Sequence, residues 1–349
     1  MEFGIQFFPD LGPSEQSGAD YWAEALHLVG LCDELGYTSV RTVEHYFHPY
    51  GGYSPNPIVF LSAAAMLTKK ARLITGAVLP TFNNPLKLAG EIGMLDAISG
   101  GRSEVGFGRA FLPQEFARFK VSLDESRARF EEGVEQVRRL LEEENVTAEG
   151  KFHSFADVTS LPRPTQQPRP PFWIAAVGSP ESFARAGRNG YEIMVIPMAG
   201  GQMPELTGIY RENWQPAGHP GRGLVMMAFH WLCHPNSAEA ANLARGPLNR
   251  YLKTLTAVSG WTDGVNSADY PGYDKIVAAL DQETFESQVA KDAAWVGSPA
   301  DIIEQVRECD RLIGGFEITS LQVDFNTVRL QDAVVSMRLF ANGVVPNLS

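Results

Sequence analysis

The sequence has few cysteines and little positive charge, and each shortage argues against a class of function. Its 349 residues contain three cysteines, Cys32, Cys233 and Cys309, which lie far apart and form no C-x-x-C pair. A disulfide framework, a dithiol redox centre and a cysteine zinc site are therefore not expected, and we predict reduced, mostly buried thiols. Lys and Arg number 29 against 41 Asp and Glu, which gives a formal net charge of −12. This balance argues against nucleic acid and anionic lipid as partners.

Long apolar runs and clustered histidines are also missing. The apolar runs are too short to span a bilayer, and Met1-Glu2-Phe3-Gly4 begins a strand pattern without a basic leader. We therefore expect a cytoplasmic protein with no membrane partner. Of seven histidines, only His45 with His48 and His230 with His234 lie close together, and neither pair has the carboxylate or cysteine partners of a metal site. The sequence therefore predicts no bound metal.

Apolar, β-branched runs alternate with helical patterns along the chain, which is typical of parallel α/β proteins. Strands are predicted over residues 2–8, 39–44, 72–79, 103–108, 172–176, 192–196, 224–233 and 316–323. Helices are predicted over residues 20–35, 58–69, 85–98, 123–144, 180–189, 238–258, 299–312 and 327–342. Eight strands with intervening helices favour a closed (β/α)₈ TIM barrel over an open doubly wound sheet. With 44% hydrophobic residues, the chain can form one such domain, 1–349, with insertions.

Two stretches interrupt this alternation. Residues 161–171 are rich in proline and lead directly into the fifth predicted strand, so we interpret them as a stiff connector. Residues 259–287 contain several glycines and show no sustained period, which is long for a structureless loop in a compact domain. The sequence leaves two alternatives open for them: a mobile lid over the barrel mouth, or a disordered insertion.

Chemically useful residues follow three of the predicted strands. Glu44 and His45 end the second strand, and active sites of parallel barrels are built at such C-terminal tips. The fourth strand runs through Gly106 and Gly108 into Arg109, whose guanidinium suits bidentate binding of a phosphate. These glycines do not continue into a dinucleotide fingerprint. Each feature alone also fits an ordinary strand end.

The fifth predicted strand gives way to a second candidate anion site. In Gly178-Ser179-Pro180, the serine can cap the following helix and the proline occupies its first turn. Free N–H groups at a helix N-terminus bind phosphate well. Two such turns on the same face of a barrel predict one shared phosphate site, although each turn alone fits an ordinary strand-to-helix connection.

Five segments in order resemble the bacterial luciferase-like family of flavin monooxygenases. They are Val-Glu-His-Tyr-Phe at 43–47, Leu-Pro-Thr at 79–81 with Asn-Pro at 84–85, Leu-Asp-Ala-Ile-Ser-Gly-Gly-Arg at 95–102, Gly-Phe-Gly-Arg at 106–109 and Gly-Ser-Pro-Glu-Ser at 178–182. Each segment is modest alone, but five at the expected barrel positions are specific. The resemblance extends from Glu2 to about Pro346.

The resemblance implies a TIM barrel that binds reduced FMN at the C-terminal ends of its strands. With O₂ the flavin would form a C4a-hydroperoxide that oxidises a small or medium organic substrate. The phosphate would lie between Arg109 and the Gly178-Ser179 turn, with Ser182 as a further donor. Family members also have a non-proline cis peptide after the third strand, here at Thr75-Gly76 or Gly76-Ala77, where the flavin ring approaches the backbone.

The resemblance also implies roles for the acid and base groups. His45 would act near flavin and substrate as acid and base, for which an ordinary histidine pKa of about 6.5 is suitable, although a structural histidine is an alternative. Glu44 would orient His45 or satisfy the backbone. Light-emitting members have a reactive cysteine at the position of Gly108; its loss weakens a specific claim of luminescence but does not forbid oxygen activation. Glu115 replaces an aspartate and is expected to tune flavin affinity.

Partners and alternatives follow from the same resemblance. Reduced flavin would come from a separate flavin reductase, and a homodimer is expected through the apolar helix at residues 58–67. The same barrel in related proteins uses the deazaflavin F420 for hydride transfer, and some shortened relatives bind flavin without turnover. All the strands of a full barrel are predicted here, which favours an enzyme. Four aromatic residues face either the substrate or the core: Phe8, Phe47, Phe111 and Trp231.

Overall fold

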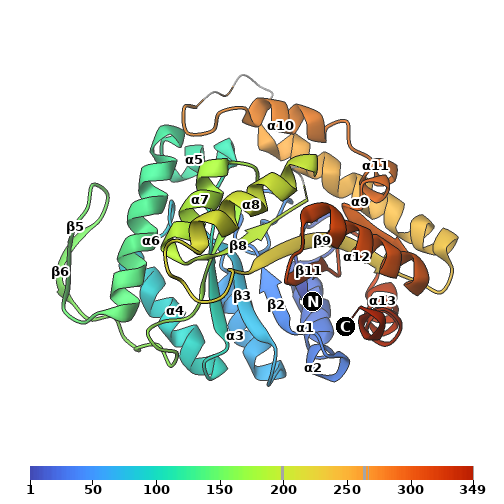
Figure 1. The fold of residues 1–349 in the computed structure, drawn as a ribbon, viewed down its shortest axis with the longest axis horizontal. Coiled ribbons are helices and arrows are strands. Elements are labelled where there is room, and N and C mark those ends of the chain that lie inside the picture. The colour runs from blue at the N-terminus through green and yellow to red at the C-terminus, as the bar shows by residue number, and fades with distance from the viewer. Residues whose placement is uncertain (198–199, 262–264, 266, 349) are drawn as a thin grey trace.

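Eight parallel strands close into a barrel surrounded by helices in the computed structural model, which describes residues 1–197, 200–261, 265 and 267–348 (Figure 1). The ring order is β9-β11-β1-β2-β3-β4-β7-β8, and β8 pairs back to β9. The strands are β1 Glu2–Phe7, β2 Ser39–Thr42, β3 Arg72–Val78, β4 Ser103–Phe107, β7 Phe172–Ala176, β8 Glu192–Val195, β9 Val225–Cys233 and β11 Ile318–Gln322. The predicted (β/α)₈ barrel is confirmed, and its strands are those expected from the sequence with slightly shorter ends.

Within the described residues, a helix covers each predicted range, but the single helix predicted over residues 20–35 is two helices, α1 and α2, and four further helices were missed. The helices are α1 Gly18–Val29, α2 Cys32–Leu35, α3 Pro57–Leu67, α4 Pro85–Ser99, α5 Pro113–Phe119, α6 Ser126–Glu142, α7 Pro180–Asn189, α8 Met203–Trp214, α9 Ser237–Ser259, α10 Tyr273–Leu280, α11 Phe285–Ala290, α12 Pro299–Ile313 and α13 Leu330–Gly343. The missed helices are α5, α8, α10 and α11. Three of them have eight residues or fewer, too short for a helical period to stand out, and α8 contains Pro204 and Gly208, which weaken its pattern.

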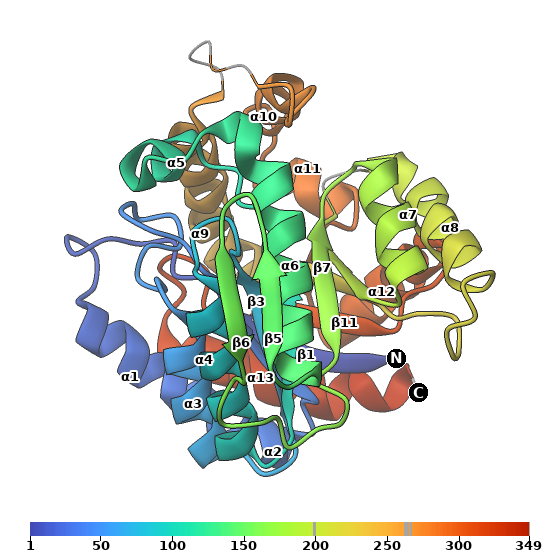
Figure 2. The same ribbon diagram turned by 90° about the vertical axis from the view of Figure 1, so that its left-hand side faces the viewer.

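Three strands of four or five residues were also missed. β10, Ala294–Gly297, pairs with β9 outside the closed ring. β5 (Val146–Glu149) and β6 (Ser154–Val158) form an antiparallel hairpin beside α6 (Figure 2). The Glu132 carboxylate of α6 fixes the hairpin turn by accepting backbone N–H groups from residues 151–153. The proline-rich residues 161–171 then lead into β7, as predicted.

The described part of the segment 259–287 contains regular secondary structure that its lack of a sustained period did not indicate. It includes α10 and the start of α11, whereas 262–264 and 266 lie outside the described residues. Tyr270 donates a hydrogen bond to the Ala110 carbonyl at 2.8 Å, and Trp261 donates one to the Phe111 carbonyl at 2.8 Å. These bonds hold the segment over the loop that follows β4. Its opening as a lid stays a prediction.

Gly106, inside β4, occupies a place where the barrel wall leaves no room for a side chain. An added Cβ would lie 2.2 Å from the Thr75 carbonyl oxygen and 2.4 Å from Cε of Met194. Relief would require moving β3 backbone, so Gly106→Ala is expected to lower the free energy of unfolding by about 3 kcal/mol in chemical denaturation. Gly208→Ala, where an added Cβ meets nothing within 4 Å, is the matched control and should be neutral or slightly stabilising. Equal losses in both variants would contradict this account.

Candidate functional site

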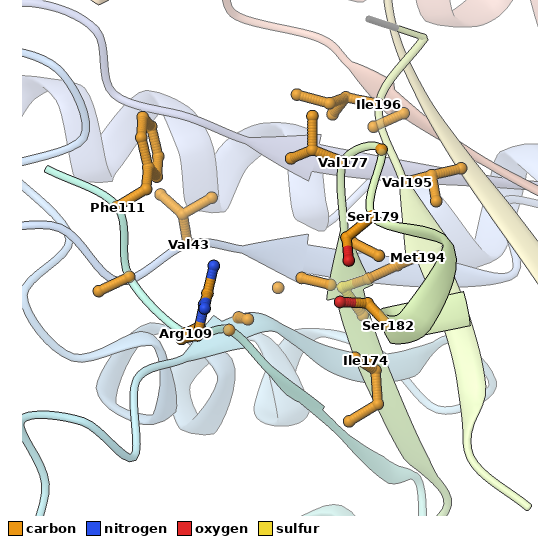
Figure 3. Close-up of a pocket in the computed structure, with 18 of the residues that line it drawn as sticks. Val43, Arg109, Phe111, Ile174, Val177, Ser179, Ser182, Met194, Val195 and Ile196 are labelled. Carbon is orange, nitrogen blue, oxygen red and sulfur yellow. The ribbon is translucent and has the colours of Figure 1, made fainter. Parts of the chain in front are cut away.

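A cavity of about 600 Å³ lies at the C-terminal edge of the barrel strands. Its wall is made by strand ends and the loops that follow them, which is where parallel barrels place their sites. The lining segments include 43–45 after β2, 76–79 at the end of β3, 108–111 after β4, 174–180 at the end of β7 and residues of the 259–287 segment. Figure 3 shows side chains from several of these elements around one space, among them Val43, Arg109 and Ile174.

Arg109 and the β7–α7 turn face each other across this cavity. Figure 3 shows the Arg109 guanidinium on one side and the hydroxyls of Ser179 and Ser182 on the other. Within the described residues, Nη1 of Arg109 is buried and has no hydrogen-bond partner. Ser179 is the N-cap residue of α7, but its side chain makes no capping bond, contrary to the sequence prediction, so its hydroxyl is free for a ligand. Beside Gly178, an added Cβ would meet nothing within 4 Å. The sequence had predicted this grouping.

Tyr270 of the 259–287 segment packs against the Arg109 side chain. The centre of its guanidinium lies 4.1 Å from the centroid of the Tyr270 ring, a cation–π distance. Two further arginines line the same part of the cavity, each paired with a carboxylate: Arg127 with Asp269 at 3.9 Å, and Arg185 with Glu131. Arg109 has no such carboxylate within 4 Å among the described residues. Of these three arginines, Arg109 is therefore the one whose charge is available to an anionic ligand.

His45 lines the cavity and is held by a carboxylate from a different loop. Its Nδ1 lies 3.1 Å from Oε1 of Glu115, a side chain with no exposed surface. The same oxygen accepts the backbone N–H of Tyr46 at 2.9 Å. With Nδ1–H donated to Glu115, Nε2 is the ring nitrogen left for proton transfer. Glu115 itself does not line the cavity, and its contact with the lining is the hydrogen bond to His45.

Glu44 satisfies the backbone, the second of the two alternatives for it. Its carboxylate accepts the Leu79 N–H at 3.0 Å, the Asn83 amide at 2.8 Å and the Tyr46 hydroxyl. Burial raises the pKa of Glu44 to about 7. These bonds tie the end of β2 to the loop after β3. The orienting role expected for Glu44 belongs to Glu115, 70 residues from His45 in the sequence.

The segment at the end of β3 was predicted in part. The peptide bond Gly76-Ala77 is cis, one of the two expected positions, and both residues line the cavity. Thr75 does not line it: its hydroxyl donates to the Gly106 carbonyl at 3.0 Å and accepts the Gly106 N–H at 2.9 Å. Thr75 therefore joins β3 to β4. Arg41, which the sequence analysis missed, donates to the Gly76 carbonyl at 2.8 Å.

Two of the four aromatic residues considered for contact with the substrate line the cavity. Phe8 and Phe111 line the cavity, but Phe47 is 56% exposed on the surface, and Trp231 is buried in the core outside the barrel. His230, the residue before Trp231, faces the cavity instead. Because strand side chains alternate between two faces, a choice displaced by one residue selects the wrong side. Further lining residues that the sequence analysis missed are Gln6, Tyr50, Tyr251, Leu252 and Gln322.

Other features of the described residues concern metals, thiols and membranes. No group of three or more His, Cys, Asp or Glu side chains in the described part of the chain is placed to hold a metal ion. The three cysteines are buried and unpaired with one another. Across the same residues, every helix is too short or too polar to cross a membrane.

Comparisons with known proteins give the family of this barrel. RslO1, a monooxygenase from Streptomyces bottropensis, has 40% sequence identity to this chain, covers 100% of both chains and superposes with a TM-score of 0.89. The oxygenase component of the flavin-dependent trigonelline monooxygenase of Acinetobacter baylyi is 27% identical over 354 residues, which covers 100% of this chain and 96% of that protein. A partial match, 34% over 167 residues, covers 49% of the F420-dependent glucose-6-phosphate dehydrogenase of Intrasporangium calvum. The sequence model of the luciferase-like monooxygenases matches residues 1–314, so the chain belongs to this family.

Proposed function

We propose that this enzyme uses reduced FMN and O₂ to transfer one oxygen atom to a small or medium organic substrate. A separate flavin reductase would supply the reduced flavin, as expected for the oxygenase component of a two-component system; the Acinetobacter baylyi relative carries that description. The observation that carries the proposal is the Arg109 guanidinium, whose buried Nη1 has no partner among the described residues, facing the uncapped turn of Ser179 across the cavity that His45 also lines.

The residues present fit the phosphate of FMN. A buried guanidinium nitrogen of Arg109 lacks an acceptor, the hydroxyls of Ser179 and Ser182 and the N-terminus of α7 can also donate, and a phosphate dianion offers several acceptor oxygens. Arg109, Gly178, Ser179 and Ser182 would hold it. The flavin ring would lie toward the Gly76-Ala77 backbone, where a side chain on Gly76 would collide with Arg41.

In this proposal the cofactor and the protein have separate chemical roles. Reduced flavin would react with O₂. The protein would orient the flavin and the substrate, exclude water and transfer protons. Nε2 of His45 would hold or deliver the proton at the reacting atoms, while Glu115 keeps Nδ1 protonated and the ring fixed. Apolar walls from Phe8, Phe111 and neighbouring side chains would exclude water.

The alternative cofactor is F420, because the partial match to an F420-dependent dehydrogenase shares part of this barrel. The two readings differ in the use of oxygen. In a stopped-flow experiment, the protein would be mixed with photoreduced FMN and then with air. Reduced FMN bound to the protein is expected to return to the oxidised spectrum later than free reduced FMN does. Identical traces with and without protein, together with binding of reduced F420, would contradict the FMN proposal.

A homodimer through α3 and α4 is the second part of the proposal. These neighbouring helices leave large apolar side chains exposed, including Val59 at 69%, Met66 at 66% and Met94 at 57%. Met66→Glu combined with Val59→Glu is expected to convert the dimer to monomer, because an apolar interface does not accommodate buried unpaired carboxylates. Light scattering after size exclusion measures this. Val335→Glu on α13, another exposed apolar position, is the control and should leave the mass unchanged; a shift in both variants would contradict the assignment.

A further inference from the structure

Four polar side chains form one layer at the floor of the cavity. Arg41 pairs with Gln6 across β2 and β1, Gln6 pairs with Gln322 across β1 and β11, and Gln322 pairs with His230 across β11 and β9. All four residues line the cavity. Positions paired in this way on four consecutive barrel strands point to the same level of the interior. The layer is therefore a continuous polar patch in a wall that is otherwise mainly apolar.

Hydrogen bonds within the layer leave its donors in excess. Arg41 donates to Oε1 of Gln6 at 2.5 Å and to the Gly76 carbonyl at 2.8 Å. The amide of Gln6 then donates to the carbonyl oxygen of Gln322 at 3.3 Å. Three buried nitrogen atoms have no partner among the described residues: Nε of Arg41, Nε2 of Gln322 and Nε2 of His230. Buried polar atoms are normally hydrogen-bonded, and Nε of Arg41 and Nε2 of Gln322 can only donate, so these two nitrogens point to a missing acceptor.

The charge of the layer is also uncompensated. Arg41 is 7% exposed, and within the described residues no carboxylate lies within 4 Å of its guanidinium, although every other arginine lining the cavity except Arg109 has one. Burial keeps His230 neutral by lowering its pKa to about 3, so this ring neither adds a charge nor supplies an anion. A buried, unpaired charge costs several kcal/mol of desolvation, and proteins retain one where a ligand compensates it.

We propose that this layer is an anion subsite that selects substrates with a carboxylate or an ionised hydroxyl attached to an apolar body. The inference rests on the proposed function of the same cavity and specifies its substrate class. The apolar body would pack on the aromatic wall beside the layer, where the Phe8 ring lies 4.5 Å from that of Tyr50 and 5.6 Å from that of Tyr251. His45, 5.3 Å from the Tyr50 ring, borders the same wall, so a substrate held there lies beside the proposed acid and base.

Binding of matched acid and amide probes tests the subsite. The probes are benzoate with benzamide, and cinnamate with cinnamamide, titrated calorimetrically into the protein with and without oxidised FMN. At least one acid is expected to bind the wild type about tenfold or more tighter than its amide, and Arg41→Gln should abolish most of this preference. Arg41→Lys, which keeps the charge but loses the planar fork, should restore part of it. Gln322→Met removes a donor without touching the charge and should reduce the preference severalfold.

The outcomes separate this inference from the proposed function. Equal binding of acids and amides by the wild type, or an acid preference that survives Arg41→Gln, overturns the subsite. If the acid preference survives in Arg41→Gln while that variant binds reduced FMN more weakly, the charge of Arg41 serves the flavin ring. That result also overturns the proposed subsite. Failure of FMN to bind, with the acid preference intact in the FMN-free titration, overturns the cofactor proposal alone. Far-UV circular dichroism confirms that each variant is folded.

Discussion

Arg109→Ala is expected to weaken FMN binding by about 10- to 100-fold, as measured by quenching of flavin fluorescence. The Arg109 guanidinium has a buried, unpartnered nitrogen and faces the free hydroxyls of Ser179 and Ser182. A hydrogen bond to a charged group contributes about 1.5–3 kcal/mol, which corresponds to this loss. Arg109→Lys keeps the positive charge without the fork and should lose less.

Arg109 also packs on Tyr270, so the variant has a second, structural way of weakening binding. Riboflavin, which has the flavin ring but no phosphate, separates the two. If Arg109 binds the phosphate, its removal should leave the affinity for riboflavin within about twofold of wild type while the affinity for FMN falls. If the residue only holds the 259–287 segment in place over the cavity, both ligands should lose affinity equally, and the phosphate assignment would be wrong.

Local patterns were sufficient to predict the barrel and much of the cavity rim. A strand run followed by glycine and arginine located Arg109, and a strand run followed by Gly178-Ser179-Pro180 located the start of α7. Closure of the barrel then brings these turns to the same edge, because all its strands are parallel. Residues whose position depends only on the strand that precedes them are therefore predictable from one sequence.

Pairings between distant segments were not predictable in this way. The carboxylate that holds His45 comes from a buried helix position, Glu115, whereas the adjacent Glu44 turns to the loop after β3. Glu44 and His45 both line the cavity after β2, but the Glu44 carboxylate accepts hydrogen bonds from the loop after β3, so adjacency in the sequence did not identify the partner of His45. Arg41 was missed for a related reason. Its place in the polar layer depends on the unpartnered nitrogen atoms of Gln322 and His230, which lie on strands nearly 200 residues or more away. No local pattern in the sequence predicts which residues of those strands pair.

His45→Ala is expected to lower turnover by about 10²- to 10⁴-fold while FMN affinity changes little, because the residue contributes proton transfer and not phosphate binding. Turnover would be measured with an acid substrate from the probe series and reduced FMN in air. Glu115→Gln keeps the size of the buried side chain and an acceptor for the Tyr46 N–H, but it removes the negative charge beside Nδ1. It should lower kcat with a smaller effect on KM.

The double variant decides whether Glu115 acts through His45. If it does, His45→Ala with Glu115→Gln should be no slower than His45→Ala alone, since the carboxylate has nothing left to orient. Multiplied losses would mean that Glu115 acts elsewhere, for example on the loop that carries Tyr46. A parallel loss of FMN affinity in His45→Ala would instead make the histidine a structural residue. The non-additivity itself is the informative quantity, because Glu115 contacts both His45 and the Tyr46 N–H, and only an effect through His45 disappears when that side chain is removed.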